Sequence, residues 1–163
     1  MEKQEFFNEI FNQHYSKVFR LCKGYMNGNE EQASDITQDV FIKVWEYLDS
    51  FRGEANISTW IYRISVNTCL LHLRKQSTKK EVKTEKMPHI AHEAYSLEEE
   101  EKLQQMYACI NKLQEKEKAI ILMVLEGVEY AQIADIMGIT EENLRVKIHR
   151  IKNTLTNCVH GNI

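Results

Sequence analysis

Apolar residues recur along most of the chain at intervals of three and four, which is the spacing of amphipathic helices. The pattern starts with Phe6, Phe7, Ile10 and Phe11, and the Asn27-Gly28-Asn29 turn interrupts it. Further helices are predicted at residues 30–48, 58–76, 97–111, 115–126, 130–137 and 141–156. The chain has 163 residues but only one proline and six glycines, so few strand-and-turn signals compete with this all-α interpretation.

A polar stretch without periodicity, residues 77–95, carries the single proline, Pro88, and is typical of a linker. Ser96 with Glu99 three residues later fits a capping box, so a new helix is expected to start there. We therefore expect two small helical domains, residues 1–76 and 96–163, joined by a flexible linker.

Residues 130–156 have the layout of a helix-turn-helix motif, with Gly138-Ile139-Thr140 as the turn between two predicted helices. Thr140 suits the N-cap, and Gly138 suits the left-handed C-terminal position. On a helical wheel, Leu144, Ile148, Ile151 and Leu155 form a narrow apolar stripe. The opposite side and its flanks carry Asn143, Arg145, Val146, Lys147, His149, Arg150, Lys152 and Asn153.

This second helix suits a DNA major groove. Arginine and asparagine hydrogen-bond base edges, a valine methyl meets a thymine methyl, and flanking lysines reach phosphates. The alternative is a surface helix whose basic side chains are only solvated.

A second candidate surface lies on the predicted helix 58–76. The side chains of Trp60, Arg63, Asn67 and Arg74 fall on one stripe, and the preceding loop adds Phe51 and Arg52. Aromatic rings stack on bases and guanidinium groups neutralise phosphates, so the stripe is suited to single-stranded nucleic acid. The alternative is that Trp60 is a core residue and the arginines are solvated.

A third surface lies on the predicted helix 30–48, opposite its apolar arc. Asp35, Gln38, Asp39 and Glu46 surround an outward Ile42. A lone apolar residue ringed by acids fits a basic protein partner, although an ordinary solvated helix face has the same composition.

Composition narrows the class of protein. Net charge is −3, but no acidic residue occurs between Glu54 and Glu81 or from Asn143 to Asn153, so two local basic segments remain. The longest apolar run, residues 119–125, is too short to span a membrane, and no signal peptide is recognised. The four cysteines contain no Cys-x-x-Cys pair, so we expect a cytoplasmic protein with reduced, buried cysteines.

In sequence order, these motifs resemble a known family. Residues 33–45, Phe51-Arg52-Gly53, 59–64 and Asn67 resemble region 2 of the extracytoplasmic-function (ECF) sigma factors of bacterial RNA polymerase, and residues 130–150 resemble their region 4. The resemblance implies promoter recognition without catalysis, cofactor, metal or small-molecule substrate. The implied partners are core polymerase, promoter DNA and an anti-sigma factor.

The resemblance also implies residue roles. Docking on the clamp helices of the largest polymerase subunit would use Asp35, Gln38, Asp39, Ile42 and Trp45. The −10 element would be held by Phe51, Arg52, Thr59, Trp60, Arg63, Asn67 and Arg74. The −35 element would be read by Tyr130, Asn143, Arg145, Val146, Lys147, His149, Arg150 and Lys152, and the same region would touch the polymerase flap.

Two other classes of protein, an enzyme and a stand-alone DNA-binding regulator, fit the sequence less well. An enzyme is disfavoured, because the sequence has no Glu-x-x-His pair, no phosphate-binding Gly-x-x-x-x-Gly-Lys loop and no Gly-x-Ser-x-Gly elbow. The His89-x-x-His92 pair is only weak evidence for a metal site. A stand-alone helix-turn-helix regulator would bind duplex DNA as a dimer, with half-sites about one helical turn apart. That alternative assigns no role to the surfaces around Trp60 and Ile42.

Overall fold

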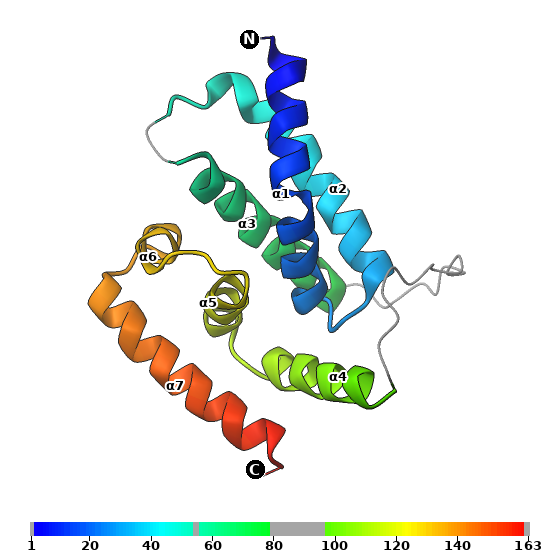
Figure 1. The fold of residues 1–163 in the computed structure, drawn as a ribbon, viewed down its shortest axis with the longest axis vertical. Coiled ribbons are helices and arrows are strands. Elements are labelled where there is room, and N and C mark those ends of the chain that lie inside the picture. The colour runs from blue at the N-terminus through cyan, green and yellow to red at the C-terminus, as the bar shows by residue number, and fades with distance from the viewer. Residues whose placement is uncertain (1, 54–55, 79–96, 162–163) are drawn as a thin grey trace.

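The structure is a computed structural model that describes residues 2–53, 56–78 and 97–161, and within them it is built from helices (Figure 1). The elements are α1 (Lys3–Tyr25), α2 (Glu30–Tyr47), the 3-10 turn η1 (Leu48–Ser50), α3 (Ile57–Thr78), α4 (Leu97–Asn111), α5 (Glu115–Leu125), α6 (Tyr130–Met137) and α7 (Glu141–Val159). The all-α prediction is confirmed. Helix α3 ends at Thr78, beyond the expected start of the linker. Ser96, His89, His92 and the rest of the predicted linker lie outside the described residues.

Local capping explains where several helices begin and end. The Asn29 side chain accepts a hydrogen bond from the Gln32 backbone N–H at 3.0 Å at the start of α2. The Thr140 hydroxyl accepts one from the Asn143 N–H at 3.1 Å at the start of α7, as the sequence predicts. Gly138 ends α6 with φ 69°, the left-handed conformation that favours glycine. The helix-turn-helix therefore has the expected boundaries.

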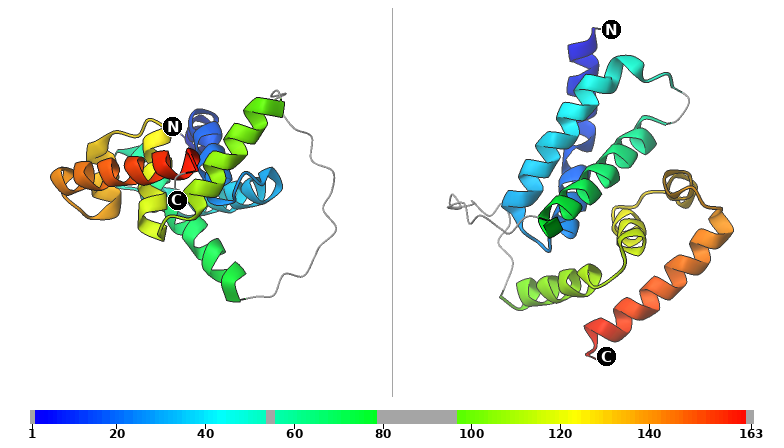
Figure 2. Two further views of the ribbon diagram at one scale, coloured as in Figure 1. Left: turned by 90° about the horizontal axis from the view of Figure 1, so that it is seen from below. Right: turned by 180° about the vertical axis from the view of Figure 1, so that it is seen from behind.

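Helices α1, α2 and α3 lie side by side and form the N-terminal bundle (Figures 1 and 2). Its core contains Val18, Leu21, Ile36, Val40 and Ile61, each almost fully buried. Burial of these side chains stabilises the bundle, since each large aliphatic side chain contributes about 1.5–3 kcal/mol.

Helices α4 to α7 form the C-terminal group, in which α7 packs on α4, α5 and α6. The core side chains here are Ile110, Ile120, Met123, Ile133, Leu144 and Ile151. The apolar stripe predicted for α7 is buried throughout, with Leu144, Ile148, Ile151 and Leu155 all facing inward. The opposite face of α7 is therefore directed outward.

The two halves pack against each other, and their buried apolar residues belong to one continuous cluster. Gly24 in α1 lies against the side chain of Leu122 in α5, where a Cβ atom would overlap the leucine. At Gly28, which has φ 84°, a Cβ atom would lie 3.0 Å from Cδ2 of Tyr107 in α4. Small residues at the end of α1 thus allow the C-terminal group to approach closely.

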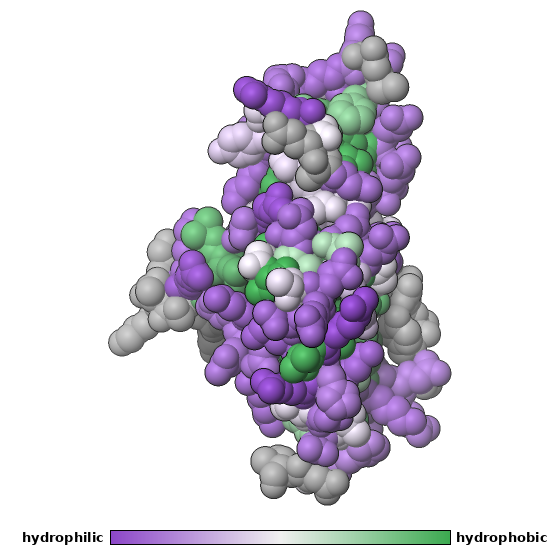
Figure 3. All heavy atoms as spheres, turned by 90° about the vertical axis from the view of Figure 1, so that its left-hand side faces the viewer, coloured by the Kyte–Doolittle hydropathy of each residue, from purple (hydrophilic) through white to green (hydrophobic). Residues whose placement is uncertain are grey.

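The surface seen in Figure 3 is mostly hydrophilic, and its apolar atoms form small separate patches. No described helix combines the length and the apolar character needed to span a bilayer.

Candidate nucleic-acid interface

The outward face of α2 has the composition that the sequence predicts. Asp35, Gln38, Ile42 and Trp45 are exposed, with Ile42 at 55% and Trp45 at 39%. The Trp45 ring packs edge-on to Phe7 at 5.3 Å between centroids. The face therefore presents apolar side chains within an acidic surrounding, which suits a basic partner helix.

Asp39 is the one acid of this face that is half-buried. Its Oδ2 lies 2.8 Å from Nε2 of His72, which projects from α3. Nearby, Nζ of Lys43 donates a hydrogen bond to the hydroxyl of Thr68 at 3.2 Å. Side chains of α3 thus fix polar groups of α2. No pattern in the sequence pointed to His72 as part of the site.

Aromatic side chains meet where the loop after η1 approaches α3. The Phe51 and Trp60 rings have centroids 5.1 Å apart and are tilted by 41°, and both residues are half-buried. Arg52 is exposed beside them. Thr59 differs from the expectation: it is only 3% exposed, because it lies on the inner side of α3, so the structure does not place it on this surface.

The rest of the predicted α3 stripe faces the C-terminal group or solvent. Asn67 is exposed. An Arg63 Nη2 atom lies 3.1 Å from Oδ2 of Asp135 in α6, and an Arg74 Nη2 atom lies 3.4 Å from Oε2 of Glu115 in α5. Both arginines are therefore engaged by carboxylates from the other half of the chain, which the sequence did not predict.

The predicted base-reading side chains of α7 are all exposed. They are Asn143, Arg145, Val146, Lys147, His149, Arg150 and Lys152. Val146 is 48% exposed although it is apolar, and Tyr130 lies half-buried at the start of α6. Among the described residues, the ion pairs on this face form within α7 itself, between neighbouring turns of the helix. One is the pair of Arg145 with Glu141, with a nitrogen–oxygen distance of 3.5 Å.

The contact between the two halves contains charged side chains that sequence reasoning missed. Lys118 of α5 is only 6% exposed and donates a hydrogen bond to the carbonyl of Tyr25 at 3.2 Å. Burial lowers the pKa of Lys118. The Glu126 carboxylate accepts two hydrogen bonds from Nε of Arg20, at 2.9 and 3.1 Å, and burial raises its pKa, an effect that Arg20 opposes. The only sequence signal was a lysine directly before the apolar run of α5.

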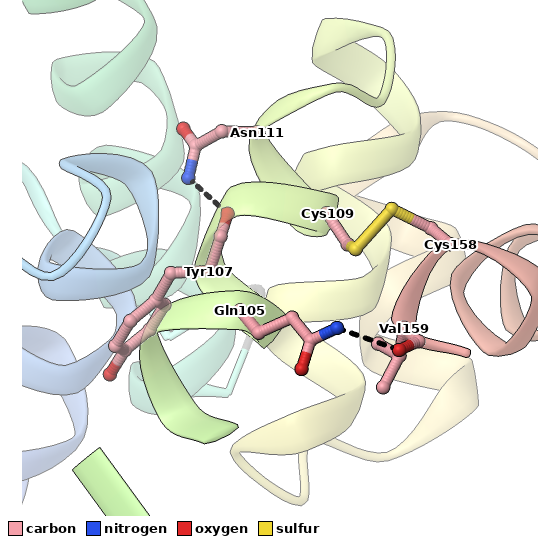
Figure 4. Close-up of a disulfide and its surroundings, with 6 residues drawn as sticks. All are labelled: Gln105, Tyr107, Cys109, Asn111, Cys158 and Val159. Carbon is pink, nitrogen blue, oxygen red and sulfur yellow. Dashed lines mark hydrogen bonds between the residues drawn. A yellow bond between two sulfur atoms is a disulfide. The ribbon is translucent and has the colours of Figure 1, made fainter. Parts of the chain in front are cut away.

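The expectation that all four cysteines are reduced is wrong for one pair. Cys109 of α4 and Cys158 of α7 form a disulfide, with Cα atoms 5.9 Å apart (Figure 4). The side chain of Gln105 donates a hydrogen bond to the Val159 carbonyl at 2.7 Å beside it. These cysteines are 49 residues apart, and only the packing of α4 on α7 brings them together. Cys22 and Cys69 are free and buried.

The part of the chain that the structure describes contains no group of three histidine, cysteine or acidic side chains that could hold a metal ion.

Comparisons with known proteins match both halves of the chain. Residues 10–79 match the family described as Sigma-70 region 2, and residues 103–155 match Sigma-70, region 4. These two regions, in this order, define a transcription initiation factor of the sigma-70 class. The chain belongs to the extracytoplasmic-function (ECF) subfamily of sigma-70 factors.

Individual relatives agree with this placement. The chain is 30% identical to the ECF RNA polymerase sigma-E factor of Escherichia coli K12, over 96% of this chain and 87% of that protein. The sigma-E factor of Haemophilus influenzae is also 30% identical, over 94% and 87%. The dimeric stand-alone regulator gains no support, because region 2 has no place in it.

Solved structures share the fold. The structure of CnrH in complex with the cytosolic domain of CnrY superposes with a TM-score of 0.74 at 17% identity, over 98% of this chain and 91% of that one. The sigma factor RpoE of Bartonella quintana, solved in complex with the anti-sigma factor NepR, gives 0.73 at 18% identity, over 96% and 98%.

Proposed function

We propose that this ECF sigma factor docks on core RNA polymerase through the outward face of α2, holds the −10 element with the Phe51 loop and α3, and reads the −35 element with α7. The observation that carries the proposal is that α7 has one buried apolar face and one exposed polar face. Its four-residue apolar stripe is buried, while every predicted base-reading side chain is exposed.

Docking on polymerase follows from the chemistry of α2. Ile42 and Trp45 provide apolar contact area, and Asp35 and Asp39 provide charge for a basic helix. Interface cores combine such apolar anchors with a polar rim. This supports the clamp helices of the largest polymerase subunit as the partner.

Capture of the −10 element as a single strand is supported by the aromatic pair. The Phe51 and Trp60 rings already contact one another at a tilt, so an unpaired base can insert beside them or replace one ring. Arg63 and Arg74 lie on one stripe of α3, and Arg52 is exposed in the preceding loop, so these three are the proposed phosphate partners. Asn67 is an exposed amide for a base edge.

Reading of the −35 element as duplex fits the second helix of a helix-turn-helix motif. Arg145 and Arg150 can hydrogen-bond guanine, and Val146 can contact a thymine methyl group. Lys147 and Lys152 on the flanks would contact phosphates.

The proposal also includes the predicted absence of catalysis, the location of the protein, its regulator and its domain boundaries. The protein supplies promoter specificity and no catalysis, acts in the cytoplasm, and binds an anti-sigma factor, as the sigma factor RpoE of Bartonella quintana binds NepR. Its region 2 unit is residues 1–76 and its region 4 unit is residues 96–163.

In vitro transcription from a genomic library tests the proposal. Core polymerase plus this chain should start transcripts at a defined set of promoters that core polymerase alone ignores. A double change, Ile42→Ala with Trp45→Ala, should abolish this output, whereas Leu97→Ala, at an exposed apolar residue in α4, should not. Unchanged initiation patterns on adding the chain would contradict the proposed function.

A further inference from the structure

The side of α7 that points directly away from the protein carries one acidic residue. The helix runs along the outer edge of the molecule (Figure 1). Its buried stripe consists of Leu144, Ile148, Ile151 and Leu155. At about 100° per residue, the line opposite that stripe runs through Glu142, Val146, His149 and Asn153. All four residues of this outer line are exposed.

The outer line is the part of α7 that would enter a major groove most deeply. Arg145 and Arg150, the two proposed guanine readers, lie on either side of it on the helical wheel. Val146, in the middle of the line, is 48% exposed although it is apolar. Residues in the N-terminal part of a recognition helix contact base edges, and Glu142 lies in the first turn of α7. Glu142 is therefore placed to meet a base.

Glu142 is also the polar residue of the outer line that has no partner among the described residues. Its neighbour Glu141 is paired, because an Oε2 atom of Glu141 lies 3.5 Å from Nη2 of Arg145. Further along the line, Nε2 of His149 lies 3.4 Å from Nδ2 of Asn153. Both glutamates benefit from the helix dipole, so this effect alone does not distinguish them.

A carboxylate can accept hydrogen bonds but cannot donate them, so it distinguishes among the four bases. In the major groove, guanine and thymine present acceptors, and adenine presents an amine next to the acceptor N7. Cytosine presents its N4 amine without an acceptor. A carboxylate among the bases is also repelled by the phosphates, so it selects largely by rejecting the wrong sequences.

We propose that Glu142 determines specificity within the −35 element: its carboxylate accepts a hydrogen bond from the N4 amine of a cytosine and rejects guanine and thymine there. This assignment rests on the proposed function of α7. Val146 lies one turn further along the helix, about 6 Å away, which corresponds to about two base pairs of duplex. The cytosine preference should therefore lie within about two base pairs of the one contacted by Val146.

The test uses holoenzyme assembled from core polymerase and the full chain. It is offered a promoter library with a randomised −35 segment, and the bound DNA is sequenced. The variant is Glu142→Gln, which is nearly isosteric and removes the charge. The matched control is Glu141→Gln, which removes the same charge one residue earlier, about 100° around the helix and beside Arg145.

We expect the native holoenzyme to favour cytosine over guanine or thymine by roughly tenfold at one position of the segment. Glu142→Gln should move this preference to adenine, because an amide matches both the N6 donor and the N7 acceptor. Glu142→Ala should lose the preference and gain no other. Glu141→Gln should keep the cytosine preference and raise affinity for all sequences alike.

Equal behaviour of the two glutamine variants, with tighter binding and an unchanged preference at every position, would overturn the proposal. Glu142 would then act only through the helix dipole and general charge repulsion. Val146→Ala in the same selection provides the positional check, since the base pair it affects must lie next to the cytosine. A cytosine preference far from that base pair would also contradict the assignment.

Arg145→Ala separates this proposal from the proposed function. If Arg145→Ala changes the −35 preference while Glu142→Gln does not, the assignment of Glu142 fails and reading by α7 stands. If neither change alters the sequences selected, reading of the −35 element by α7 fails as well.

Discussion

Nε2 of His72 in α3 lies 2.8 Å from Oδ2 of Asp39 in α2, so a histidine on one proposed interface fixes an acid on another. Without His72, the Asp39 carboxylate would be free to rotate. We expect His72→Ala to weaken binding to core polymerase by roughly fivefold, within the range of about 1 kcal/mol for one hydrogen bond. Surface plasmon resonance with immobilised polymerase measures this change.

The control for that experiment is His160→Ala, which removes an exposed histidine at the end of α7. It should leave polymerase binding unchanged. Equal losses in both variants would mean that the contact with Asp39 has no role in docking.

Arginines and lysines on α7 are expected to differ in what they recognise. Arg145→Ala or Arg150→Ala should cost about 1–3 kcal/mol at particular bases of the −35 element. Lys152→Ala should weaken all sequences more evenly and reduce the salt dependence. Holoenzyme binding to a library of −35 variants separates the two outcomes. A uniform loss from every basic substitution would contradict base reading by α7.

The aromatic pair is expected to hold an unpaired base. Phe51→Ala removes one ring of the Phe51–Trp60 pair, and stacking on a base is worth about 1–3 kcal/mol. Promoter opening by the holoenzyme, followed by permanganate reactivity of unpaired thymines, should fall accordingly, while initiation on a template already melted at −10 should fall less. Phe51→Trp should restore opening; equal loss on both templates would point to a folding defect instead.

The disulfide is expected to stabilise the C-terminal group. A link between Cys109 and Cys158 closes a loop of 49 residues. Chain-entropy arguments give about 4 kcal/mol for a loop of this size. The double change Cys109→Ser and Cys158→Ser should lower the free energy of unfolding by up to that amount in denaturant titrations. The difference should vanish when the native chain is treated with a reductant, and its persistence would show that packing of the sulfur atoms is responsible.

The pH dependence of stability should carry a contribution from Glu126. Burial raises the pKa of its carboxyl group, and Arg20 opposes the rise. A raised pKa in the folded chain means that the stabilisation is complete below the ordinary glutamate pKa and is lost as pH rises through the folded value. The free energy of unfolding of the native chain, relative to Glu126→Gln, should therefore fall between the usual glutamate range and neutral pH. A difference that does not change with pH would contradict the assignment.

The helices and their outward faces could be predicted because periodicity and capping are local properties. The buried stripe of Leu144, Ile148 and Ile151, and the cap at Thr140, follow from spacing alone. Thr59 was assigned to the −10 site only because of the family resemblance, whereas its position in α3 turns it inward, where it is 3% exposed.

Contacts between the halves could not be predicted, because they depend on a three-dimensional arrangement that local patterns do not encode. The pairing of Arg63 with Asp135 joins residues 72 positions apart. The link between Cys109 and Cys158, within the C-terminal group, likewise depends on the packing of α4 on α7. The lack of a Cys-x-x-Cys pair and of a signal peptide favoured reduced cysteines. Glu126, which no sequence pattern singled out, lies at the contact between the two halves and pairs with Arg20.

The absence of a side chain at Gly24 determines how closely α1 and α5 can approach each other. One added carbon there would overlap the Leu122 side chain, which would have to move, and it would leave every group proposed to contact DNA or polymerase intact. A residue larger than glycine at this position would therefore exchange a close contact between the two halves for a looser one, so this one position sets how tightly they can pack.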